Sequence, residues 1–429
     1  MKTGQYLQLF RTSSLARNIS KVLGGDVFSK ILGIATAFIL IRNLKVSDYA
    51  YLTVFYSVLG LIPGIVGNGI NLALVRFSAE YISEAKRRPL ELYAIGFIFQ
   101  IVLYLVLGLF LFVFSDSVAN LFFGGKMYIN SLQFGLVGGF GYLISQAGRC
   151  VYQAEEKFGL YVRILWLKQS FILVFVAGLL FFRLLTFDLT VKAMISIELL
   201  VGLMLVFHIF HDFRVNDLLV FLRSRFSVIK EFLASTQWLI AYFIVLAVFQ
   251  QMDIFMLAHF SSPGELATYG VAFRYYSLFL LTLGSIHAVL LPRFSKADMK
   301  NLSKQRHFAV KWMKVVSWLI IPIAAVDLFG KPLFDLVNGA QYEKSFYIFI
   351  ILSVGIWLSL MFSPLVNIII NRKAFKFLFT ISVVASIFNF FGNRFLIPLW
   401  GGFGAAVVVI ASHGIINISS GIRVFCSAK

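Results

Sequence analysis

The chain alternates long apolar runs with short polar connections. One run, FIFQIVLYLVLGLFLFVF, extends from Phe97 to Phe114. A helix needs about 20 apolar residues to cross the roughly 30 Å hydrocarbon core of a bilayer, and this run comes close to that length. The pattern predicts twelve membrane spans, at residues 19–42, 48–73, 90–115, 127–152, 158–183, 188–210, 232–258, 265–291, 308–328, 343–370, 374–398 and 401–424.

We expect these spans to be helices. Backbone polar groups find no water in lipid, so only helices and closed barrels cross a membrane. Barrel strands alternate polar and apolar residues, and the runs in this chain do not. The predicted fold class is therefore an all-α polytopic membrane protein.

Composition supports this prediction. Of the 429 residues, 60% are hydrophobic and 13% are charged, whereas soluble domains are about 25% charged. The connections on the predicted outer side are short. Glycan polymerases and ligases typically carry catalytic groups on long outer loops, so the sequence argues against an enzyme of that kind. The phosphate-loop, HExxH and GxSxG signatures are absent, and we expect neither enzymatic activity nor a cofactor.

The positive charges are distributed unevenly between the two sides. The formal net charge is +19, and 27 of the 38 Lys and Arg lie at the termini or in the even-numbered connections. By the positive-inside rule both termini are cytoplasmic. Nucleic acid is not an expected partner, because the charges are spread among short connections. The richest stretch, Arg293 to Lys314, is either a solvated loop that sets topology or a contact for anionic lipid.

An internal repeat is indicated by three short matches at nearly one offset. LVRFS at Leu74 to Ser78 recurs as LPRFS at Leu291 to Ser295, and AEEKF pairs with NRKAF at the same offset of 217. YLTVF pairs with YGVAF at an offset of 218. We therefore predict two six-helix lobes, at residues 1–210 and 232–429. Residues 211–231 are predicted to be a basic amphipathic linker on the inner leaflet.

Ionisable residues inside the spans are the candidates for function. Each costs about 2.5–3.5 kcal/mol at the bilayer centre on insertion scales, so each should pair or face a wet cavity. They are Asp26, Lys30, Lys168, Glu198, Asp253, Arg274 and His413.

The residues alone leave alternatives open at several of these positions. Lys168 either snorkels to the interface or has a function. Glu198 either couples protons or has a buried partner. His413 is either a packing residue or a proton carrier. Asp26 and Lys30 are spaced as an i,i+4 pair that would be neutral on one helix face.

Two stretches carry a resemblance to a known family. GDVFSKILGIATAFILIRNLKVSDYAYLTVFYSV begins at Gly25, and its second-half counterpart QQMDIFMLAHFSSPGELATYGVAFRYYSL begins at Gln250. They resemble the polysaccharide-transporter branch of the multidrug/oligosaccharidyl-lipid/polysaccharide exporter superfamily, and above all the Wzx-type O-antigen flippases. The resemblance covers essentially the full length of the chain.

The resemblance implies a V-shaped pair of lobes in the bacterial inner membrane, with a cavity between spans one, two, seven and eight. It implies alternating access that moves undecaprenyl-pyrophosphate-linked oligosaccharide, an O-antigen or capsule repeat unit, to the outer leaflet with an ion gradient. The expected partners are this substrate and membrane lipids, and a glycan polymerase and a chain-length regulator are further candidates.

Carried onto this chain, the resemblance gives residue-level expectations. Fixed positive charge for the pyrophosphate would come from Lys30 and Arg274. Sugar hydroxyls would meet amides and aromatic rings, and the coupling ion would be taken by a carboxylate. The expected sugar contacts are Asn71, Gln250 and Tyr275, with Asn68, Gln251 and Tyr276 as further candidates, and the expected coupling residues are Asp26, Asp253 and Glu198.

A cation-coupled multidrug exporter of the same superfamily is the alternative, because that branch also has twelve spans. A cationic drug should prefer acidic cavity residues, whereas here two cations accompany two acids. Lipid II flippases of the superfamily have fourteen spans, which makes a peptidoglycan substrate a poorer fit.

Overall fold

The computed structural model describes residues 14–85, 89–211, 226–277, 301–318 and 320–426, and this part of the chain is helical and contains no strand. The first half of the chain forms α2 (Ser14–Asn43), α3 (Val46–Ala85), α4 (Leu90–Val113), α5 (Ser115–Phe123), η1 (Lys126–Tyr128), α6 (Ile129–Ala154), α7 (Phe158–Phe181) and α8 (Phe187–Phe210). The second half forms α10 (Phe226–Phe249), α11 (Met252–Phe260), a helix over residues 263–277, α13 (Leu302–Ser317), α14 (Ile320–Phe329), α15 (Lys331–Asn338), η3 (Ala340–Tyr342), α16 (Glu343–Asn371), α17 (Phe375–Trp400) and α18 (Gly402–Cys426).

The chain is a multi-pass membrane protein. Nine helices of the described part are long and apolar enough to cross a membrane. They leave out α2 and α6, and the predicted eighth span is described only over residues 263–277. Apolar side chains face outward, as lipid contact requires: a stripe on α4 is between 52% and 72% exposed and consists of Val102, Val106, Leu109 and Val113. The predicted fold class, an all-α polytopic membrane protein, is confirmed.

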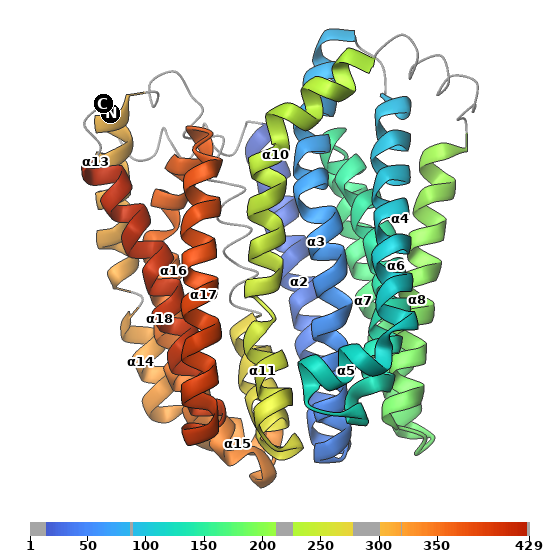
Figure 1. Ribbon diagram of the computed structural model, residues 1–429, viewed down its shortest axis with the longest axis vertical. Coiled ribbons are helices and arrows are strands. Elements are labelled where there is room, and N and C mark those ends of the chain that lie inside the picture. The colour runs from blue at the N-terminus through green and yellow to red at the C-terminus, as the bar shows by residue number, and fades with distance from the viewer. Residues whose placement is uncertain (1–13, 86–88, 212–225, 278–300, 319, 427–429) are drawn as a thin grey trace.

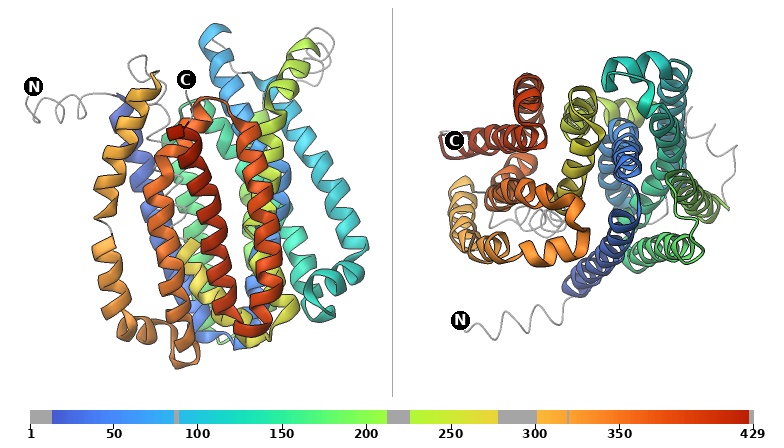
Figure 2. Two further views of the ribbon diagram at one scale, coloured as in Figure 1. Left: turned by 60° about the vertical axis from the view of Figure 1, so that its left-hand side comes forward. Right: turned by 90° about the horizontal axis from the view of Figure 1, so that it is seen from below.

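The helices form two groups that lie side by side. In Figure 1, α2 to α8 lie on the right, α13 to α18 lie on the left, and α10 and α11 lie between them. The view from below in Figure 2 separates the same two groups. The first group packs mainly through α3 with α6, α6 with α8 and α2 with α7, and the second through α18 with α16 and α17. The start of α2 and the end of α18 lie at the upper end in Figure 1, and we call the opposite end the far end.

Both halves repeat one structural feature at the far end. A short helix, α5 or α15, is followed by a turn of 3-10 helix, η1 or η3. Each 3-10 turn ends in a buried tyrosine, Tyr128 in the first half and Tyr342 in the second, 214 residues later. The two halves are therefore built alike in their outer connections, although the sequence matches did not include these segments.

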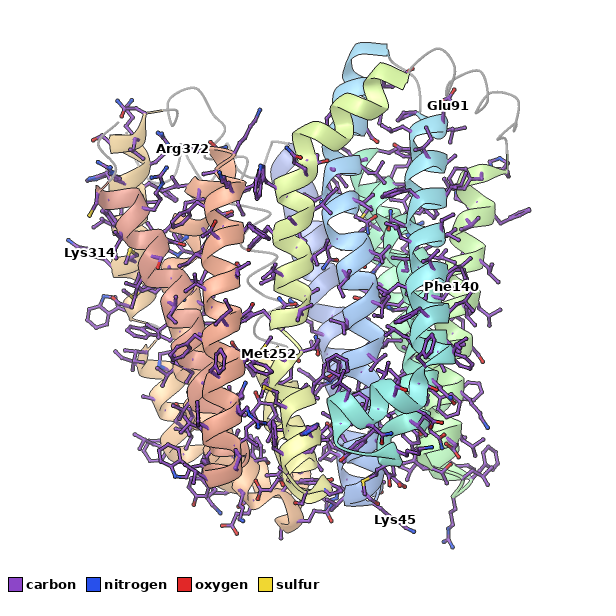
Figure 3. All side chains as sticks on the ribbon, viewed as in Figure 1. Lys45, Glu91, Phe140, Met252, Lys314 and Arg372 are labelled. Carbon is purple, nitrogen blue, oxygen red and sulfur yellow. The ribbon has the colours of Figure 1, made fainter. Side chains whose placement is uncertain are left out.

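The predicted seventh span, residues 232–258, is wrong as a single helix. It consists of α10, which ends at Phe249, and α11, which begins at Met252. Gln250 and Gln251 form the break, which lies at the middle of the molecule's height beside Met252 (Figure 3). The break contains no Pro or Gly, so the apolar pattern of the sequence did not predict it. Open backbone at this depth is tolerated where it is buried in protein or lines a polar cavity.

The predicted linker lies largely outside the described residues. Residues 212–225 are not described, and α10 already begins at Phe226, so residues 226–231 belong to the helix that follows. The amphipathic character of the linker and the exact lobe boundaries stay predictions.

Candidate functional site

The two halves are in close contact where α3 meets the helix over residues 263–277. A Cβ on Gly270 would lie 2.3 Å from Thr53 Oγ1, so a residue with a side chain would not fit here. Thr53 and Gly270 are both buried. We call the contact between these two helices the seam. It brings spans two and eight together, two of the helices that the family resemblance places around a cavity.

Arg274 lies one helical turn beyond Gly270, on the second half. Its guanidinium carbon is 4.7 Å from the centre of the Tyr56 ring, which belongs to α3 of the first half. The Tyr56 hydroxyl donates to Met194 Sδ at 3.4 Å, which fixes the ring. A cation over an aromatic face is attracted by about 0.5–2 kcal/mol, and the N–H groups at the guanidinium edge stay able to donate. The seam therefore carries a positive charge shared between the halves.

Tyr275 is next to Arg274 but points to another partner. Its hydroxyl donates to Asn338 Oδ1 at 2.7 Å, and its ring lies 5.2 Å from that of Phe334. Both partners belong to α15. The structure therefore places this predicted sugar contact against the far-end helix of its own half.

Asp253 is buried in the first turn of α11. The hydroxyl of Tyr269 donates to Asp253 Oδ2, and both side chains are almost inaccessible. Within the described part of the chain, no Lys, Arg or His forms an ion pair with this carboxylate. Gln250 lies exposed at the adjacent helix break, and Gln251 is the residue before α11. Asp253 is thus a buried acid with a neutral donor beside a polar break in span seven.

Glu198 has a buried cationic partner. Lys168 Nζ lies 2.9 Å from Glu198 Oε1, and the side chains are only 11% and 6% exposed. Ser145 donates to the other carboxylate oxygen at 3.2 Å, and the Lys168 ammonium lies 5.4 Å from the centre of the Tyr142 ring. These contacts join α6, α7 and α8 within the first half. Glu198 was expected either to couple protons or to have a buried partner, and in the structure it has a buried partner, Lys168. The Lys168 side chain is itself buried and does not snorkel to the interface.

The predicted amide contact Asn71 lies away from the seam. Its Oδ1 accepts from Gln100 Nε2 at 3.1 Å, so it joins α3 to α4. Asn68, one turn earlier, accepts from Gln146 Nε2 of α6 at 2.9 Å. The two amides on α3 therefore face different neighbours, and neither is brought to Arg274.

Asp26 and Lys30 lie on α2, one helical turn apart. Lys30 is partly buried. The side chain of Asp26 lies outside the described part, so the proposed pair between them stays a prediction. The remaining ionisable candidate, His413, packs edge-on against Phe249 at 5.2 Å, as the packing interpretation expects.

Sequence reasoning missed a chain of buried amides in the second half. Asn393 Nδ2 donates to Asn389 Oδ1 at 2.8 Å, and Asn389 Nδ2 donates to Ser412 Oγ at 3.3 Å. All three side chains are buried between α17 and α18. The cost of burial points first to ionisable residues, whereas the signal for these amides is a pair of Asn at i,i+4 in an apolar span. In the part of the chain that the structure describes, no group of three or more His, Cys, Asp and Glu is arranged to hold a metal ion.

The halves also touch at the far end. The Arg42 guanidinium at the end of α2 donates to the Leu336 carbonyl near the end of α15. The rings of Tyr49 and Tyr342 meet edge-to-face with centres 5.9 Å apart. In the mirrored position, α5 of the first half packs on α11 of the second. The short far-end helix of each half thus packs on the other half. These contacts hold the two halves together at the far end.

The far-end helix α15 is itself tied to the span that follows it. Lys331 Nζ lies 2.8 Å from Asp335 Oδ2 and 2.8 Å from Glu343 Oε1. The hydrogen bond that the Lys331 ammonium donates to Asp335, and then the one that it donates to Glu343, raise the pKa of Lys331. The ammonium therefore stays charged and links α15 to the first turn of α16.

Three solved structures with a similar fold are a flippase and two transporters. The chain is similar to the lipid II flippase MurJ in an inward closed conformation, with 15% identity over 94% of this chain and 87% of that one, at a TM-score of 0.73. An inward-facing multidrug resistance MATE transporter of the MOP superfamily is 13% identical over 95% and 98%, at a TM-score of 0.71. The MATE transporter VcmN of Vibrio cholerae is 13% identical over 96% and 97%, at a TM-score of 0.62. At these identities the likeness establishes the fold.

No curated protein sequence matches the chain. A family model described as polysaccharide biosynthesis protein matches residues 15–298, which is more than half of the 429 residues. This match agrees with the resemblance to a polysaccharide family that the sequence suggested. The chain belongs to the polysaccharide biosynthesis protein family.

Proposed function

We propose that this protein is a flippase that moves undecaprenyl-pyrophosphate-linked oligosaccharide, an O-antigen or capsule repeat unit, from the inner to the outer leaflet of the bacterial inner membrane. The observation that carries the proposal is Arg274, which belongs to one half of the molecule and rests on Tyr56 of the other. The family and the fold support a transport protein, and the positive charge at the seam supports an anionic substrate.

A pyrophosphate cannot enter hydrocarbon without compensating charge, because an isolated anion in a low dielectric is prohibitively costly. Arg274 suits this task, since its face is held by Tyr56 while its planar edge offers paired donors to phosphate oxygens. Lys30 on α2 would supply a second charge. Moving the halves apart at the seam would release Arg274 from Tyr56, so that substrate binding and lobe movement become linked.

Asp253 is the favoured coupling residue among the three predicted ones. Glu198 already has Lys168 and Ser145 on its two oxygens. Asp253 has the Tyr269 hydroxyl instead, and a buried carboxylate without a cationic partner is best accommodated with a proton or a metal cation bound. Asp253→Asn should therefore keep the hydrogen bond and the fold but lose the response of transport to an ion gradient.

The proposal predicts that Arg274→Ala abolishes surface glycan in a strain that depends on this protein, at an unchanged protein level in the membrane. Arg394→Ala is the matched control, because Arg394 also lies over an aromatic ring, that of Phe260 at 5.1 Å, but on the exposed side of α17. Surface glycan measured by gel staining should be lost in the first variant and kept in the second. Normal glycan in the Arg274→Ala strain would refute the role of the seam charge.

A cation-coupled multidrug exporter is the alternative, supported by the fold shared with MATE transporters and by the buried acid Asp253. The two functions differ in the phenotype of a deletion strain. Sensitivity to cationic drugs with intact surface glycan would favour the exporter, and loss of glycan without drug sensitivity would favour the flippase.

A further inference from the structure

The first part of the ninth span carries a row of basic side chains on its outward face. The row lies on α13 with spacings of three, four and three residues and consists of Lys304, His307, Lys311 and Lys314, all exposed. At 3.6 residues per turn these positions fall on one face. The buried positions of α13, on the opposite face, are Gln305, Ala309 and Val316. We call the four residues the basic stripe.

Among the residues that the structure describes, no carboxylate forms an ion pair with the lysines of the stripe. The segment Leu302–Ser317 contains no Asp or Glu. Lys304, Lys311 and Lys314 form no ion pair within the part of the chain that the structure describes. Arg306, on the side of the helix, instead donates to the Val424 carbonyl at 2.6 Å. Figure 3 shows Lys314 extending from the edge of the molecule, away from the other helices.

The depth of the stripe is unusual for a solvated connection. Helices α13 and α14 together run over 28 residues, from Leu302 to Phe329, which is about 42 Å at 1.5 Å per residue. Counting about 20 residues of hydrocarbon core back from Phe329 places the edge of the core near Val310. Lys304 and His307 then lie among the headgroups, and Lys311 and Lys314 lie at or just below the boundary, where their ammonium groups must reach upward.

The same face turns apolar directly below the stripe. Trp318 is 71% exposed and Ile321 is 57% exposed. Tryptophan is favoured at the level where headgroups meet acyl chains. An acidic protein segment would satisfy the lysines and leave these apolar side chains uncovered, whereas a phospholipid covers both with one molecule.

We infer that the basic stripe of α13 binds the phosphate headgroups of anionic phospholipids in the leaflet opposite the far end, with the acyl chains lying on Trp318 and Ile321. Anionic lipid attracts basic residues near this surface, and the attraction fades within about a Debye length. Bound lipid would hold this edge of the second half at the membrane surface. The inference is independent of which substrate the protein carries.

The test measures contact between lipid and α13 by fluorescence quenching next to the basic stripe. Val315, 64% exposed on α13, is replaced by Cys and labelled with a bimane fluorophore in a full-length chain that carries Cys150→Ser and Cys426→Ser. The protein is reconstituted in phosphatidylcholine vesicles that contain 10 mol% of either brominated phosphatidylglycerol or brominated phosphatidylcholine, which quench the fluorophore on contact. We expect at least twofold stronger quenching by the anionic lipid, and we expect raised salt to reduce the difference.

The lysines are tested against a charge-matched control. Lys311→Gln with Lys314→Gln should bring the quenching ratio of the two lipids close to one. Arg163→Gln with Lys376→Gln removes the same charge from exposed positions near the same end of α7 and α17 and should leave the ratio unchanged. Equal quenching by both lipids in the unsubstituted stripe, or an equal loss of preference in the control, would overturn the inference.

Discussion

Pairing decides which buried ionisable side chains are available for transport. Glu198 and Lys168 neutralise one another inside the first half. Asp253 accepts from the neutral hydroxyl of Tyr269, and Arg274 lies over the face of Tyr56 at the seam. The acid and the cation that remain chemically available thus both belong to the second half, close to its contact with the first.

The paired residues give a prediction about stability. Removing one partner of a buried ion pair leaves an unpaired charge and typically costs about 3–5 kcal/mol, whereas replacing both by apolar residues is often nearly neutral. Lys168→Met and Glu198→Leu should therefore each lower the melting temperature of the detergent-solubilised protein markedly, and the double variant should recover most of the loss. If the decrease in melting temperature of the double variant equals the sum of the two single decreases, the two residues are not coupled.

The cost of burying a charge was enough to select the ionisable candidates from the sequence. It could not predict which of them form ion pairs with each other. All seven ionisable residues named from their cost lie in helices of the described structure. Lys168 and Glu198 are 30 residues apart, and no spacing rule links different helices. Asn71 and Tyr275 were expected near the substrate for their chemistry, but each turns to a partner in its own half.

The lengths of the apolar runs predict the membrane helices, but they do not predict where a helix is interrupted. The predicted tenth span, 343–370, agrees closely with α16, Glu343–Asn371. The break between α10 and α11 escaped prediction because Gln250 and Gln251 interrupt hydrophobicity without interrupting helix propensity. The short helices α5 and α15 were missed because nine or eight residues are too few for a periodic pattern.

Packing between α3 and α10 gives a prediction at this scale. A Cβ on Gly69 would lie 2.7 Å from the Ile240 Cα, so Gly69→Ala must push the helices apart at a cost of about 1–3 kcal/mol. Gly178 in α7 has no neighbour within 4 Å of its Cβ position, and there Ala should add about 0.5–1 kcal/mol of helix stability. Opposite shifts of the melting temperature are expected, and a rise for Gly69→Ala would contradict this packing.

At the scale of the whole molecule, the internal repeat predicted two similar lobes from sequence alone. Which side of the contact between them is closed could not be predicted, because that depends on contacts such as Arg42 with Leu336 that belong to one conformation. The proposed transport by alternating access would require these far-end contacts to separate in each cycle. The far end is therefore where a covalent link should stop transport.

A cross-link prediction compares two tyrosine pairs of similar geometry in a chain free of Cys150 and Cys426. Tyr49 and Tyr342 have ring centres 5.9 Å apart across the two halves, and Tyr51 and Tyr128 have ring centres 5.7 Å apart within the first half. With both residues of a pair changed to Cys, a short cleavable cross-linker should block translocation for the first pair alone, and cleavage should restore it. Unimpaired transport by the cross-linked first pair would exclude separation at the far end.

The central claim is tested most directly by translocation in vesicles. Purified protein is reconstituted with labelled undecaprenyl-pyrophosphate-linked oligosaccharide, and a glycosidase added outside measures the fraction that changes leaflet, with and without proton or sodium gradients. The account predicts protein-dependent movement that one gradient accelerates, with the acceleration lost in Asp253→Asn and the movement lost in Arg274→Ala. Vesicles that export a cationic dye while leaving the lipid-linked oligosaccharide in place would contradict it.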